Sequence, residues 1–213
     1  SGDSLLHIHW PSTARNGRLM VKMFDGGRSS STSEAVYVLV DMERSVHQGI
    51  GDESTEEYAV KAAASLVKKY IDEGLQVGLI LSGEPIVSFA PDRGEEHYYR
   101  MLEALALVHG NGTVPIDRVI NEDSKAISGE TTVVIVTPAT TPSLVDSVRQ
   151  LRGREILVSV ISVDPASFGG DESSASITRH LRWLGIHVYV ARKGEDMGAS
   201  LDRRTTPYTL QYI

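Results

Sequence analysis

Five short runs of apolar residues recur along the chain, and most of them are separated by stretches with helical periodicity. The runs are AVYVLVD at 35–41, LQVGLILS at 75–82, TTVVIVT at 131–137, EILVSVIS at 155–162 and IHVYVA at 186–191. Continuous apolar runs with many β-branched residues are typical of a mostly parallel sheet that helices cover on both faces. The expected helices lie at 54–74, 95–110, 141–153 and 172–185. The sequence therefore predicts a three-layer α/β domain.

Two further stretches define the outer parts of this arrangement. EPIVSFAPDRG at 84–94 reads as a short extra strand that ends at Pro91 and Gly94, and we expect it to pair antiparallel at one edge of the sheet. RLMVKMF at 18–24 alternates like a half-exposed strand, and a Gly/Ser-rich turn follows it. We therefore divide the chain into an N-terminal strand segment and linker at 1–34 and an α/β domain at 35–213.

Composition excludes several classes of function. With 213 residues, 41% of them hydrophobic, the chain can bury one sizeable core. Its formal charge of -7 repels nucleic acid, and we expect the basic stretch RQLRGRE at 149–155 to be the end of an amphipathic helix. The absence of cysteine excludes disulfides and thiolate chemistry. The chain begins abruptly with SGDSLLHIHW, so we expect it to be a piece of a longer protein.

Ligands of open α/β sheets bind outside the carboxyl ends of the strands, and Asp41 lies at such an end. The usual motifs for phosphate or acyl chemistry are missing there. GIGDES and GNGTVP lack the third glycine of a dinucleotide fingerprint, no Gly-x-x-x-x-Gly-Lys run exists, and Ser82 lacks the preceding glycine of a nucleophile elbow. A nucleotide-binding enzyme or a serine hydrolase would need other motifs.

The strand-end residues resemble those of the von Willebrand factor A-like, Rossmann-type domains. That family binds Mg²⁺ through an Asp-x-Ser-x-Ser strand end, a loop threonine and a later Thr-Asp-Gly strand end. Here DMERS places Asp41, Glu43 and Ser45 at the first three positions, and GNGTVPIDRVI places Thr113 at the threonine. VVIVTPA, however, places Pro138 where the aspartate stands.

The resemblance thus implies a degenerate metal-ion-dependent adhesion site. Asp41, Ser45 and Thr113 would hold Mg²⁺, which prefers oxygen ligands, and Glu43 would restore the number of carboxylates. Proline supplies no ligand atom, and no cofactor other than Mg²⁺ is expected. The simpler alternative, which we favour, is that Asp41 and Ser45 satisfy backbone donors in the turn or cap the segment that follows.

The start of the chain resembles the bacterial family known as domain of unknown function 58. The residues that carry the resemblance are Gly2, Asp3, Ile8, Trp10, Ala14, Arg15, Leu19 and Val21. In that family this segment precedes a von Willebrand factor A-like domain, so the two resemblances together cover nearly the whole chain.

Membership in that family would imply a role without established enzyme activity. Its members have amino-terminal transmembrane helices followed by such a region, and their genes lie near those of MoxR-type AAA ATPases. The resemblance implies an adaptor or chaperone-like partner of such an ATPase. It also implies that this chain is the cytoplasm-facing part of a bacterial membrane-anchored protein, with the tether outside the sequence given.

Three functions follow for the strand-end cluster. The preferred one is non-enzymatic binding of a protein partner through Asp41, Glu43, Ser45 and Thr113. The rival is a metal-dependent hydrolase in which Asp41 and Glu43 hold Mg²⁺ and His47 acts as general base. The third is a domain whose carboxylates replace the metal and offer a fixed negative charge to a basic partner.

Three residues outside this cluster receive structural interpretations. Glu84 and Asp164 also follow strands, and capping or turn roles explain them most simply. Trp183 is expected to contact the core or a neighbouring helix.

Overall fold

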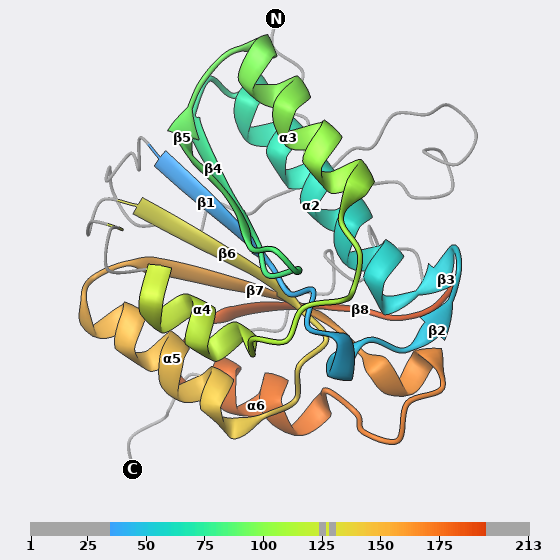
Figure 1. The fold of residues 1–213 in the computed structure, drawn as a ribbon. Helices are drawn as coiled ribbons and strands as arrows, with labels where there is room; N and C mark the ends of the chain where they lie inside the picture. Colours follow the sequence, from blue (N-terminus) through green and yellow to red (C-terminus); the bar gives the residue numbers. More distant parts are fainter. Residues whose placement is uncertain (1–34, 124–126, 128–130, 195–213) are drawn as a thin grey trace, which may run out of the picture.

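A six-stranded sheet forms the centre of the domain (Figure 1). A computed structural model describes residues 35–123, 127 and 131–194. The strands of the sheet are β1 (Ala35–Val40), β4 (Gln76–Leu81), β5 (Val87–Asp92), β6 (Thr131–Thr137), β7 (Leu157–Val163) and β8 (His187–Ala191). Their order is β5-β4-β1-β6-β7-β8, with β5 antiparallel to β4 and every other pair parallel. The expected mostly parallel sheet with an antiparallel edge strand is confirmed.

Helices cover both faces of the sheet, as expected. The helices are α2 (Thr55–Asp72), α3 (Glu95–Leu107), α4 (Ile116–Asp123), α5 (Pro142–Gly153) and α6 (Ala175–Trp183). Figure 1 shows α2 and α3 on one face, and α4, α5 and α6 on the other. Between β1 and α2 lie the 3-10 turn η1 (Arg44–Val46) and a small hairpin of β2 (Gly49–Ile50) and β3 (Glu53–Ser54), and the 3-10 turn η3 (Pro165–Phe168) follows β7.

Capping chemistry explains where α2 begins and ends. The Ser54 hydroxyl accepts a hydrogen bond from the Glu57 amide at 3.2 Å, which satisfies one of the free donors of the first turn. Glutamates in the first turn and Lys69 in the last complement the helix dipole. Gly74, with φ of 77°, then takes the left-handed conformation that turns the chain toward β4.

Each central strand buries both of its faces, which is why its sequence is apolar throughout. In β1, Val36, Val38 and Val40 pack with α2 and α3, whereas Leu39 packs with α4 and α5 on the opposite face. This alternation places two hydrophobic clusters on either side of one sheet.

The edge strand ends where the sequence indicated. Its last residue, Asp92, lies between Pro91 and Gly94. The register of β5 against β4 shifts between the pairs Val77–Asp92 and Leu79–Phe89, and a proline without an amide hydrogen is tolerated at such an irregular edge.

Trp183 was expected to be a core or helix contact, but its side chain is 82% exposed. Ile177 and Leu181, one turn apart, form the buried side of α6. Trp183 follows Leu181 by two positions and therefore lies on the outer side of the helix.

The N-terminal predictions fall outside the described residues. They comprise the strand at 18–24, the linker at 25–34 and the motif residues between Gly2 and Val21, so the division at residue 34 stays a prediction. Within the described ranges, no helix is long and apolar enough to cross a membrane.

The two-sided core predicts a sharp contrast between two exchanges to alanine. Leu39→Ala removes a fully buried side chain and should lower the free energy of unfolding by about 2–5 kcal/mol. Ile50→Ala, at a side chain that is 91% exposed, should change it by less than about 0.5 kcal/mol. Urea unfolding followed by circular dichroism measures both, and equal effects would contradict the assigned core.

Candidate functional site

The Asp41 carboxylate lies at the centre of the strand-end cluster and is fully buried. Its Oδ2 accepts a hydrogen bond from the Thr137 hydroxyl at 2.6 Å, and its Oδ1 accepts one from the Glu43 amide at 3.1 Å. The Ser82 hydroxyl is a third hydrogen-bond partner, and its oxygen accepts the Met42 amide at 2.8 Å. One carboxylate thus connects the ends of β1, β6 and β4.

Burial dominates the acid–base behaviour of this carboxylate. Loss of hydration raises the pKa of Asp41 to about 7, although the hydrogen bonds from Thr137, Glu43 and Ser82 act in the opposite direction. Asp41 therefore lies beneath the surface and has a structural role. Its bond from the Glu43 amide is the contact with a turn donor that the favoured alternative describes.

Above Asp41, the loops that follow β1 and precede α4 are joined through their backbones. Glu43 and Gly112 form a parallel bridge, in which the Arg44 amide donates to the Gly112 carbonyl at 2.9 Å. The Gly112 amide donates to the Met42 carbonyl at 2.8 Å. This bridge brings Glu43 and Ser45 into the same region as Thr113, as the sequence analysis expected.

Two hydroxyl–carboxylate pairs occupy the surface of this region. Ser45 Oγ donates to Glu43 Oε1 at 2.5 Å, and Thr113 Oγ1 donates to Glu84 Oε2 at 3.1 Å. Ser45, Thr113 and Glu84 are exposed, and Glu43 is half-buried. We call Glu43, Ser45, Glu84 and Thr113 the rim.

Asn111 fixes the position of Glu84 within the rim. Its side-chain oxygen accepts the Glu84 amide at 2.9 Å, and its side-chain nitrogen donates to the Glu84 carbonyl at 3.2 Å. The loop that carries Thr113 is thereby attached to the end of β4 by both side chain and backbone.

His47 lies beside Asp41, but both of its ring nitrogens are engaged. Nε2 is 3.0 Å from the Asp41 carbonyl oxygen, which can only accept, so Nε2 carries the hydrogen. Nδ1 is 3.0 Å from the Thr55 hydroxyl, and burial lowers the pKa of His47. The Thr55 hydroxyl also donates to the Gln48 carbonyl at 3.3 Å, so His47 and Gln48 share one partner at the start of α2. His47 holds the loop against the start of α2 and has no ring nitrogen left for a substrate.

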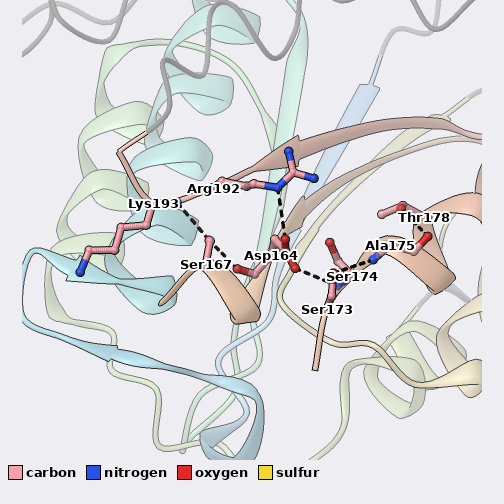
Figure 2. Close-up of polar contacts among 8 residues, drawn as sticks. All are labelled: Asp164, Ser167, Ser173, Ser174, Ala175, Thr178, Arg192 and Lys193. Carbon is pink, nitrogen blue, oxygen red and sulfur yellow. Dashed lines mark hydrogen bonds and ion pairs between the residues drawn. The ribbon is translucent and has the colours of Figure 1, made fainter. Parts of the chain in front are cut away.

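Asp164 shows the turn and capping role expected for it (Figure 2). Its nearly buried carboxylate accepts the Ser174 amide at 2.8 Å, just before α6, and pairs with Arg192 Nε at 3.2 Å. The Ser167 hydroxyl donates to the Asp164 carbonyl at 2.7 Å. These contacts join the end of β7 to α6 and to the end of β8, apart from the rim.

The residues predicted to bind Mg²⁺ are hydrogen-bonded within the protein in this structure. Both oxygens of Asp41 already accept hydrogens from the protein, Ser45 donates to Glu43, and Thr113 donates to Glu84. These bonds leave lone pairs on the hydroxyl and carboxylate oxygens, so the Mg²⁺ site stays a prediction. Within the described ranges, no group of three or more acidic or histidine side chains has the arrangement of a metal site.

Sequence reasoning missed Thr137, Ser82 as a partner of Asp41, and the link from Thr113 to Glu84. For Thr137 a signal existed, because it is the polar residue that ends an apolar run and stands just before Pro138. The other links depend on which strand ends are neighbours, and the sequence does not reveal that order.

Solved structures with the same fold identify the class of domain. BatB from Bacteroides thetaiotaomicron, a conserved hypothetical protein, superposes with a TM-score of 0.56 at 16% identity, over 78% of this chain and 93% of BatB. The SpRpn10 VWA domain superposes with a TM-score of 0.52 at 11% identity, over 78% of this chain and 93% of that domain. At these identities the likeness shows the fold alone, and the fold is that of a von Willebrand factor A-like domain.

The sequence comparisons then give the family. Residues 1–168 match the model of the family described as Protein of unknown function DUF58, and the chain belongs to this family. The uncharacterized protein YeaD of Bacillus subtilis strain 168 is 28% identical over 122 residues, which are 57% of this chain. The match covers only 28% of YeaD. The expected family and fold are both confirmed.

The buried carboxylate predicts a pH dependence of stability. Because the pKa of Asp41 is about 7 in the folded protein and about 3.9 in an unfolded chain, the folded state binds more protons between those values. Stability from this group should therefore fall as pH rises from 4 to 7, by at most about 1.4 kcal/mol per pH unit, and be constant above. Asp41→Asn should remove this slope. Urea unfolding of both proteins at pH 5 and pH 8 checks it, and parallel profiles would contradict it.

The close approach at Gly112 makes this position intolerant of any side chain. A Cβ atom there would lie 2.9 Å from the Met42 carbonyl oxygen and still closer to the Ser82 carbonyl oxygen, both of them rigid backbone. Gly112→Ala should therefore displace the loop from Glu43 and lower the free energy of unfolding by about 1–3 kcal/mol. Gly153→Ala, where a Cβ meets no atom within 4 Å, is the matched control. Urea unfolding measures both, and equal stability would refute the tight contact.

Proposed function

We propose that the chain is a non-enzymatic protein-interaction module whose rim binds a basic segment of a protein partner. The observation that carries the proposal is the pair of hydroxyl–carboxylate contacts at the rim, Ser45 with Glu43 and Thr113 with Glu84. Each hydroxyl orients a carboxylate at the surface, where a metal-binding relative of this fold would present a cation. A lysine or arginine of the partner is the complementary group.

The surroundings of the rim support binding without catalysis. His47, the candidate base, uses both ring nitrogens within the protein, and Asp41 lies beneath the surface with both oxygens engaged. In this proposal Asp41 positions the loop of Glu43 and Ser45, and the partner contacts Glu43, Ser45, Glu84 and Thr113.

We propose a MoxR-type AAA ATPase as the partner, with the chain acting as an adaptor in protein assembly. Membership in the DUF58 family supports this choice through the gene neighbourhood described above. In the same proposal the chain is the cytoplasm-facing part of a membrane-anchored bacterial protein, so that the rim meets an ATPase in the cytoplasm.

The test is binding of the purified chain to the MoxR-type ATPase of the same organism. Glu43→Gln combined with Glu84→Gln removes both rim carboxylates and should weaken binding about tenfold or more, because each close charge pair contributes on the order of 1 kcal/mol. Glu96→Gln combined with Glu103→Gln removes two exposed charges from α3 and should change binding less than about twofold. Surface plasmon resonance measures both affinities. Equal weakening by the two double variants would show that the rim is not the binding site.

Calorimetric titration with Mg²⁺ and Mn²⁺ separates this proposal from the metal-dependent alternatives. We expect no heat of binding at millimolar metal. Saturable heat that Ser45→Ala and Thr113→Ala abolish would instead support a metal site at Asp41, Ser45 and Thr113.

A further inference from the structure

The outer side of α6 presents an exposed tryptophan among basic residues. Trp183, the last residue of the helix, is 82% exposed. Arg179 and His180 lie one turn before it and are also exposed, whereas Ile177 and Leu181 form the buried side of the helix. Trp183 and Arg179 are four positions apart and therefore share the outer side.

Two further arginines, Arg152 of α5 and Arg182 of α6, lie at the same end of the helix. Arg152 of α5 donates to the carbonyl of Leu184, the residue after Trp183. Arg182 Nη2 donates to the Val188 carbonyl at 3.2 Å, at the start of β8. We call Arg152, Arg179, Arg182 and Trp183 the Trp183 patch.

The positive charge of this patch is not neutralised locally. Within residues 35–123, 127 and 131–194, none of Arg152, Arg179 and Arg182 forms an ion pair with a carboxylate. Burial and, secondly, the charge of Arg192, which itself pairs with Asp164, lower the pKa of Arg182. In a chain whose formal charge is -7, this is a local concentration of positive charge.

The chemistry of the patch matches the surface of an anionic bilayer. Its indole is 82% exposed and offers a large apolar surface beside the arginines. Tryptophan side chains are enriched at the headgroup level of bilayers, and arginines interact favourably with anionic headgroups. We propose that the Trp183 patch docks on the surface of an anionic phospholipid bilayer, with Trp183 in the headgroup region and the three arginines at the phosphates.

This docking mode would orient the rim, a consequence that rests on the proposed function. α6 begins next to Asp164, at the carboxyl ends of the strands. It runs back along the sheet and ends near the amino end of β8 (Figure 1). Trp183 therefore lies at the end of α6 farther from the rim. We expect one indole and three guanidinium groups to bind a membrane weakly, because even a single covalently attached acyl chain gives only marginal, reversible binding. The patch would orient a domain that is held at the membrane by other means.

Tryptophan fluorescence of the full 213-residue chain tests the proposal. The sequence holds two tryptophans, so Trp10→Phe leaves Trp183 as the single reporter. With vesicles of equal parts phosphatidylglycerol and phosphatidylcholine, we expect the emission to shift to shorter wavelength and the chain to co-sediment with the vesicles. Addition of 0.5 M salt should reverse both effects, because it shortens the electrostatic screening length to about 4–5 Å. Vesicles of phosphatidylcholine alone should produce neither.

Substitutions assign any binding to the patch. Trp183→Ala, Arg179→Glu, and Arg179→Glu with Arg182→Glu should each lower co-sedimentation at least about fivefold. Arg179 is exposed and its side chain forms no hydrogen bond or ion pair within the described residues, so its single exchange stays informative if the double variant is unstable. Lys61→Glu with Lys68→Glu, the same charge change on exposed positions of α2, should leave binding within about twofold.

Each alternative outcome overturns the proposal. It fails if vesicles neither shift the emission nor sediment the chain, or if both vesicle types bind equally. It also fails if poly-glutamate shifts the emission while vesicles do not, which would indicate an acidic protein partner. Glu43→Gln with Glu84→Gln should leave vesicle binding unchanged, so failure at the rim and failure at the patch are distinguishable.

Discussion

A single buried carboxylate holds together the working end of this domain. Asp41 accepts hydrogen bonds from Thr137, Ser82 and the Glu43 amide, and thereby joins the ends of β6 and β4 to β1, the strand between them. A carboxyl group without water needs all of these donors. This network positions the loop that carries Glu43 and Ser45, because the Met42 amide donates to Ser82 and the Glu43 amide donates to the carboxylate.

Thr137 links the end of β6 to Asp41 and to the residues that follow the strand. It donates to Asp41, and its oxygen in turn accepts the Ala139 amide at 2.8 Å. The strand end is thereby closed by internal bonds. The hydroxyls that remain at the surface, those of Ser45 and Thr113, turn to Glu43 and Glu84.

The sequence predicted the sheet well because each strand is buried on both faces, and continuous apolar runs are a direct record of that burial. It also placed Asp41 correctly at a strand end. The links from Asp41 to Ser82 and from Thr113 to Glu84 were out of reach, since they depend on β1 lying between β4 and β6. The prediction for Trp183 was wrong because tryptophan was assigned to the core by its residue type. Ile177 and Leu181 form the buried side of α6, and Trp183 lies on the other side.

Helix α6 connects the two surfaces that the proposals assign to different partners. Its first turn is fixed at the carboxyl edge of the sheet, where Asp164 accepts the Ser174 amide, and its last residue is the exposed Trp183. A carboxylate-bearing rim and an arginine-bearing patch therefore lie toward opposite edges of one rigid sheet. Attraction of the patch to an anionic surface would leave the rim on the side of the domain that faces away from that surface. An adaptor that must present its rim to a partner in solution gains from such an orientation even when the membrane contact itself is weak.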